Sequence, residues 1–133
     1  MKSMATDIEI INGVSWSYRM TDRGAEVVGV ADVTPEVMIP SVLGGNSVTS
    51  IGKAAFKGCI GLVSIDIPTS VMWIGDGAFT GCSGLTSVKI GDGATRIEGR
   101  AFGGCIALAS VTVASRVMRV EDLDFWGCQD DPL

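Results

Sequence analysis

Four cysteines are the side chains of this sequence whose type and spacing most invite chemistry. They lie 23 residues apart, at Cys59, Cys82, Cys105 and Cys128. An even number of cysteines is compatible with disulfides, and neighbouring turns of a repeat bring equivalent residues near disulfide distance. Zinc sites use close pairs such as CxxC, which the sequence lacks. Because all four hold one equivalent position, we expect free, buried thiols that act as small apolar side chains in one inner column.

Catalytic chemistry has few candidates in this chain. Histidine is absent from the sequence, which excludes Ser-His-Asp and Cys-His arrangements and histidine-ligated metals. Segment 75–81, GDGAFTG, resembles a phosphate-binding loop, but it lacks the P-loop lysine and its counterparts recur in phase along the chain. The acidic tail offers Glu121, Asp122 and Asp124 without a neighbouring pocket of other chemistry. We therefore expect no catalytic residue, no metal site, no cofactor and no enzymatic activity.

The 23-residue period extends well beyond the cysteines. In phase with them recur Phe56, Phe79, Phe102 and Phe125; Gly58, Gly81, Gly104 and Gly127; and Ile51, Ile74, Ile97 and Val120. A period between about 20 and 50 residues is typical of a solenoid, in which each unit buries its apolar face only by stacking on its neighbours. The repeat therefore predicts a column-shaped core.

Side-chain directions within one coil follow from its apolar pattern. In the second coil we expect Ile74, Ala78, Phe79, Cys82, Leu85, Val88 and Ile90 to point inward. The alternation at Val88 and Ile90 predicts a short strand, and equivalent strands of successive coils should lie parallel, about 4.8 Å apart. The glycine-rich segment between isoleucine and cysteine should form a turn and a single helical or 3₁₀ turn.

The chain divides into four parts by this pattern. They are a flexible N-terminus at 1–6, a β-meander cap and transition at 7–50, the repeats at 51–128 and an acidic tail at 129–133. Asn12-Gly13 is a strong hairpin signal. Alternating apolar residues from Val14 to Met20 give the meander one aromatic face, which we expect to cover the open end of the first coil.

The frame IGxxAFxGCxxLxxVxI, with IP-x-SV after its first copy at 67–71, resembles the BspA-like leucine-rich repeat. The resemblance covers roughly residues 33–128. It implies an α/β repeat solenoid, a right-handed leucine-rich-repeat superhelix with a short parallel sheet on its concave face. It also implies a secreted or cell-surface protein, mostly bacterial, with a role in adhesion and protein binding and no enzymatic activity in the repeat.

Charge and hydropathy exclude two classes of partner. The net charge is −5 and no basic stripe is visible, so we expect no nucleic-acid binding. No apolar run approaches the roughly 18 residues that span a membrane, so we expect no membrane insertion. Because residues 1–10 include no apolar h-region, we expect no signal peptide in this chain.

Two surfaces are candidates for binding a protein or glycan ligand. On the concave face, the outward residues are Ser64, Asp66, Ser87, Lys89, Ser110 and Thr112. A side stripe, in phase with Ser50, is formed by Trp73, Arg96 and Arg119. The alternative to a binding module is an assembly unit, a homo-oligomer through the C-terminal edge. There we expect the last regular strand, around Ser110, to have a neighbour on one side only and Phe125 and Trp126 to be exposed. The loss of leucine at Asp131 favours a natural cap there, and the lack of a covering element favours a chain cut from a longer array.

Overall fold

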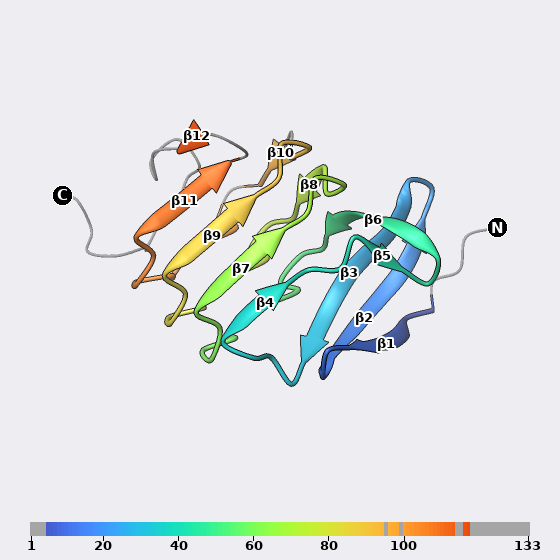
Figure 1. The fold of residues 1–133 in the computed structure, drawn as a ribbon, viewed down its shortest axis with the longest axis horizontal. Coiled ribbons are helices and arrows are strands. Elements are labelled where there is room, and N and C mark those ends of the chain that lie inside the picture. Colours follow the sequence, from blue (N-terminus) through green and yellow to red (C-terminus); the bar gives the residue numbers. More distant parts are fainter. Residues whose placement is uncertain (1–4, 95, 99, 114–115, 118–133) are drawn as a thin grey trace.

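The computed structural model describes residues 5–94, 96–98, 100–113 and 116–117, and they form a solenoid of short strands (Figure 1). The chain begins with β1 (Asp7–Ile11), β2 (Val14–Thr21) and β3 (Gly24–Ala31). The other strands are β4 (Glu36–Met38), β5 (Val42–Leu43), β6 (Asn46–Ile51), β7 (Ser64–Ile67), β8 (Trp73–Ile74), β9 (Ser87–Ile90), β10 (Arg96–Ile97), β11 (Ser110–Val113) and β12 (Arg116–Val117).

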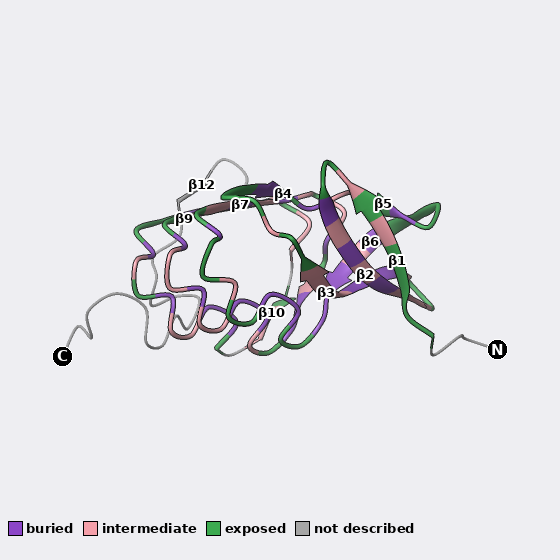
Figure 2. Ribbon diagram, turned by 90° about the horizontal axis from the view of Figure 1, so that it is seen from below, coloured by how far each residue is buried: buried purple, intermediate pink, exposed green. Residues whose placement is uncertain are grey.

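Successive coils contribute strands to two separate sheets. The five-stranded sheet has the order β12-β11-β9-β7-β4, and the seven-stranded sheet has the order β1-β2-β3-β6-β8-β10, with β5 paired to β6. Figure 2 shows the coils passing from one sheet to the other around a buried interior. Repeat strands pair in parallel and in phase with the period, as Ile65 with Val88 and Ile51 with Ile74. The predicted parallel stacking is therefore confirmed.

The N-terminal meander continues the seven-stranded sheet. β1, β2 and β3 pair antiparallel, and β3 then pairs in parallel with β6 of the repeat. The turn at Asn12 and Gly13 has φ of 53° and 82°, which is the geometry that a two-residue hairpin of type I′ requires. Trp16 is buried and packs edge-on against Phe56, with ring centroids 5.8 Å apart. The aromatic face of the meander thus lies on the first coil.

The core is a column of equivalent residues. All seven side chains expected to point inward in the second coil are buried, which confirms the assignment. Phe56, Phe79 and Phe102 stack along the axis with centroid separations of 4.8 and 5.0 Å. Each phenylalanine therefore has part of its contact surface supplied by the neighbouring coil, and no single coil can bury its own ring.

The α/β label that the resemblance implied is wrong for the residues described by the structure, because they include no helix. Between isoleucine and cysteine the chain makes successive turns, with Ala78 N–H bonded to Gly75 O and Cys82 N–H to Phe79 O. Thr80 N–H also bonds within the coil, to Gly77 O, but two N–H groups of this segment leave it: Phe79 N–H donates to Ala101 O at 2.7 Å and Gly81 N–H to Gly103 O at 2.8 Å in the next coil. An α-helix needs those donors for its own carbonyls.

Left-handed residues also interrupt each turn segment. Gly58, Gly81 and Gly104 have φ between 73° and 78°, and Ala54, Gly77 and Arg100 have φ between 57° and 66°. Both sets repeat at 23 residues. Two left-handed residues per segment prevent a helical run, because L-residues in a helix need negative φ.

The expected one-sided edge at the last regular strand is also corrected. β12 pairs antiparallel with the end of β11, through Thr112 with Val117 and Val113 with Arg116. β11 therefore has a neighbour on both sides at its C-terminal half. Arg119, Phe125, Trp126 and Cys128, together with the acidic tail, lie outside the described residues. Within the described part of the chain, no helix has the length and apolarity to cross a membrane.

Replacing Phe79 with alanine tests the stacked column. The ring is fully buried between two other rings, so Phe79→Ala should lower the free energy of unfolding by about 3–5 kcal/mol in chemical denaturation. Ile60→Ala is the matched control, because Ile60 lies in the neighbouring coil and its side chain is 71% exposed. It should change the free energy of unfolding by less than about 0.5 kcal/mol. Equal effects of the two substitutions would contradict the column.

Candidate functional site

The cysteine column occupies the interior. Cys82 and Cys105 are buried, Cys59 is half-buried, and all three are free thiols. The Sγ atoms donate hydrogen bonds backward along the axis, from Cys82 to Phe56 O at 3.1 Å and from Cys105 to Phe79 O at 3.2 Å. A side-chain hydrogen bond with Cys82, together with burial, raises the pKa of the Cys59 thiol. The prediction of free thiols in one column is confirmed for these three, and they act in packing.

The outer face of the five-stranded sheet carries the six residues predicted for the concave face. Parallel register places them in two rows, with Ser64, Ser87 and Ser110 in one and Asp66, Lys89 and Thr112 in the other. β4 extends both rows, because Glu36 pairs with Ser64 and Met38 with Asp66. Met38 is 72% exposed, so the second row has an apolar end beside its two opposite charges.

A groove of about 580 Å³ runs along this second row. The β1–β2 turn forms one wall with Ile11 and Asn12, and the sheet contributes Met38, Asp66 and Lys89. Pro40 and Pro68, at the ends of β4 and β7, lie beside them. The groove therefore combines apolar surface with one carboxylate and one ammonium group, at the place where the meander meets the repeats.

The side stripe belongs to the seven-stranded sheet. Register places Trp73 between Ser50 and Arg96, as the period predicts. The row continues into the meander, since Ser50 pairs with Glu26 and Glu26 with Arg19. We call the set Arg19, Glu26, Ser50, Trp73 and Arg96 the junction row. It crosses five strands and joins the cap to the repeats.

Trp73 is held by a partner from the next coil. Its indole N–H donates to Glu98 Oε2 at 2.9 Å, and the Arg96 guanidinium pairs with the same carboxylate. The Trp73 N–H and Arg96 together hold the pKa of Glu98 below its ordinary value. Glu98 stands where the first two coils have Gly52 and Gly75. This single departure from the repeat therefore fixes the orientation of the half-buried indole.

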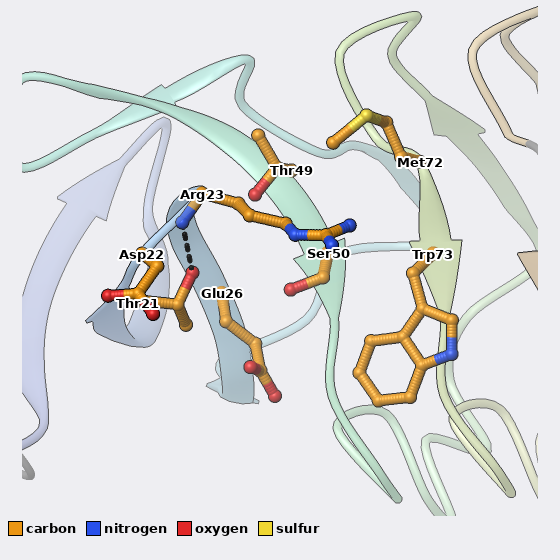
Figure 3. Close-up of a pocket in the computed structure, with 8 residues that line it drawn as sticks. All are labelled: Thr21, Asp22, Arg23, Glu26, Thr49, Ser50, Met72 and Trp73. Atoms are coloured by element: carbon orange, nitrogen blue, oxygen red, sulfur yellow. Dashed lines mark hydrogen bonds between the residues drawn. The ribbon is translucent and has the colours of Figure 1, made fainter.

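A cavity of about 250 Å³ lies over the junction row (Figure 3). The residues that line it are Thr21 of β2, Asp22 and Arg23 of the β2–β3 turn, Glu26 of β3, Thr49 and Ser50 of β6, and Met72 and Trp73. Figure 3 shows Arg23 reaching from the turn toward β6, and the Trp73 nitrogen facing away from Glu26. Arg23 N–H donates to Thr21 Oγ1 at 3.1 Å, which shapes the turn.

The groove and the cavity are two hollows in the described surface. Neither brings together a nucleophile, a base and an orienting group of the kind that covalent catalysis needs. Across the described ranges, no group of three cysteine, aspartate or glutamate side chains is arranged to hold a metal ion. What the two surfaces offer is fixed aromatic, hydroxyl and charged groups around hollows of ligand size.

The sequence prediction missed several of the surface residues, among them three that lie outside the regular repeat. Met38, Glu26 and Arg19 come from β4 and the meander, which do not carry the full repeat. For Met38 a signal existed, because segment 37–40, VMIP, is similar to 65–68, IDIP. For Glu26 no signal existed, since a register irregularity between Ala25 and Glu26 decides which residue faces Ser50.

Comparison with known proteins gives one family and several structures. The family model for the BspA type leucine rich repeat region matches residues 37–130, in six copies. No curated protein matches the chain. A leucine rich repeat protein of T. pallidum is 32% identical, with a TM-score of 0.71, over 74% of this chain and 47% of its own.

Two further structures share the fold. A leucine rich cell surface protein of Faecalibacterium prausnitzii is 24% identical, with a TM-score of 0.66, over 82% of this chain and 32% of its own. A leucine-rich repeat protein of Bacteroides capillosus is 23% identical, with a TM-score of 0.70, over 94% of this chain and 88% of its own. At these identities the likeness concerns the fold alone. The chain spans less than half the length of the T. pallidum and F. prausnitzii proteins.

Acid should release Trp73 from Glu98. The pKa of this carboxyl is lowered in the folded protein. The stability that the ionised Glu98 contributes is therefore complete above the ordinary glutamate pKa of about 4.3, and it is lost as the pH falls below that value. The fluorescence of the parent minus that of Trp73→Phe should therefore show a step centred below that pH, with far-UV circular dichroism as a check on folding.

Glu98→Gln should abolish this step, because the amide oxygen still accepts the indole N–H but does not titrate in this range. Glu36→Gln, at an exposed position on β4, is the matched control and should leave the step in place. A step that survives in Glu98→Gln would show that another group controls the indole.

Proposed function

Since the chain belongs to the BspA-type leucine-rich repeat family, we propose that it is a non-enzymatic binding module for a protein or glycan partner outside the cell. The partner would contact the outer face of the five-stranded sheet, which we expect to be the concave face because the family resemblance implies it. The observation that carries this proposal is the groove of about 580 Å³ beside the row from Met38 to Lys89.

The chemistry of the groove supports a macromolecular partner. Met38 offers a large exposed apolar side chain, and methionine adapts to irregular partner surfaces. Asp66 and Lys89 stand at paired positions on neighbouring strands, so a partner with one charge of each sign could meet both. Charges at the rim of such a surface mainly set orientation and association rate, while buried apolar contacts supply most of the affinity.

The strands beneath this surface are suited to hold it rigid. Ile65, Ile67, Val88 and Ile90 alternate with the outward residues and are all buried in the core. Side chains on a strand of fixed register keep fixed spacing. A partner would therefore find the same arrangement before and after binding, which lowers the ordering cost of association.

Binding can be measured with purified extracellular-matrix proteins and a printed glycan array, followed by surface plasmon resonance on each hit. We expect saturable binding to at least one member. Met38→Ala and Lys89→Glu should each weaken it on the order of tenfold. Lys57→Glu is the matched control on an exposed turn and should leave the affinity unchanged.

Two results would count against this function. One is the absence of any partner together with turnover of a hydrolase substrate. The other is equal weakening by Lys57→Glu and Lys89→Glu, which would point to net charge rather than to the groove. The alternative, self-association through the C-terminal edge, predicts a mass that rises with concentration in light scattering, whereas a binding module should stay monomeric.

A further inference from the structure

The cavity over the junction row contains the two buried polar side chains of the described residues. Glu26 is 7% exposed and Ser50 is 8% exposed, and they are paired neighbours on β3 and β6. The other buried side chains among the described residues are hydrophobic, with Tyr18 the one among them that carries a hydroxyl group. Polar groups are costly to bury without partners, so their position at the floor of a cavity suggests a ligand that supplies hydrogen bonds.

The Glu26 carboxylate has unused capacity to accept hydrogen bonds. Arg19 Nη2 approaches its two oxygens at 3.4 and 3.5 Å, whereas charge-assisted N–H···O bonds are usually about 2.7–2.9 Å long. The Nε of Arg19 is buried and makes no hydrogen bond. An ionised carboxylate offers about four acceptor sites, so donors entering from the cavity would improve the present contacts.

Gly52 leaves room for this carboxylate. A Cβ atom at Gly52 would collide with Glu26 Oε2, so only glycine lets the carboxyl group lie against the first coil. The Gly52 N–H donates a hydrogen bond to Val27 O at 2.8 Å. The backbone therefore positions Glu26 without taking up its oxygens.

Trp73 supplies a fixed apolar surface on the opposite side. Because its N–H is bonded to Glu98, the ring offers the cavity carbon atoms and no donor. Its six-membered ring lies toward Glu26 and Ser50 (Figure 3). A large, rigid aromatic surface of this kind gives contact area at low entropic cost.

The charges around the cavity balance. The carboxylates of Asp22 and Glu26 are matched by the guanidinium groups of Arg19 and Arg23. A charged ligand would lose its hydration without a net opposite field to compensate. The hydroxyls of Thr21, Thr49 and Ser50 suit a ligand with many neutral hydrogen-bonding groups.

We propose that this cavity binds one neutral pyranose ring of a glycan. The apolar face of the sugar would lie on Trp73, its hydroxyls would donate to Glu26, and Arg23 would donate to a sugar oxygen. At about 250 Å³ the cavity is smaller than the usual 300–1,000 Å³ of sites for larger ligands, which favours a single ring. It shares no lining residue with the groove on the other sheet, so it stands independently of the function proposed above.

The test uses the methyl pyranosides of glucose, galactose, mannose and N-acetylglucosamine as probes of the whole chain. Saturation-transfer NMR and isothermal calorimetry should show millimolar binding of at least one of them. Trp73→Ala and Glu26→Gln should each weaken that binding on the order of tenfold or more. Trp73→Phe, which keeps a ring, should weaken it less.

Lys57→Ala is the matched control, since Lys57 is exposed and lines neither the cavity nor the groove, and it should leave sugar binding unchanged. Thermal unfolding of each variant checks folding; if Glu26→Gln fails to fold, the comparison of the two Trp73 variants decides. Binding of none of the four sugars, sugar binding that survives Trp73→Ala, or binding of Nα-acetyl-lysine amide in place of sugars would overturn the proposal.

Discussion

Each coil of this chain leaves an apolar face open, and only the next coil closes it. The stack of Phe56, Phe79 and Phe102 is the clearest form of this constraint, with ring separations of 4.8 and 5.0 Å. The same stacking directs the backbone: N–H groups of one turn segment donate to carbonyls of the next coil, as from Phe56 to Ala78 O at 2.7 Å. Because these donors are used between coils, the segment forms turns in place of a helix. At the N-terminal end Trp16 of the meander takes the place of a further phenylalanine.

The stacking also explains how much of the fold follows from the sequence. A strict period fixes which residues are equivalent, so the inward positions, the parallel register and the rows of outward residues could all be predicted. The acceptor of each turn N–H could not be predicted, because it depends on the distance between coils. The α/β label was wrong for that reason. The short strand β12 was missed as well, since residues 116–117 belong to no repeat position expected to form a strand.

The residues of the candidate sites also differ in whether the repeat period predicts their positions. Ser64, Asp66, Lys89, Trp73 and Arg96 lie in repeats, and their rows follow from the period. Glu26 and Arg19 lie in the meander, where a register irregularity sets the pairing. The cavity therefore arises where a periodic row meets a non-periodic one. Glu98 shows the same principle within the repeat, because its departure from the glycine of earlier coils gives Trp73 a partner.

The central claim is that cap and coils form one cooperative unit, so that the junction between them is as rigid as the core. Native-state hydrogen exchange measures this most directly. The amide of Gly52 bonds to Val27 O across the junction, and that of Phe79 bonds to Ala101 O inside the stack. We expect both amides to exchange only through global unfolding and to give equal opening free energies. A Gly52 amide that opens at a far lower free energy than Phe79 would show that the meander separates from the repeats on its own, and would contradict the account.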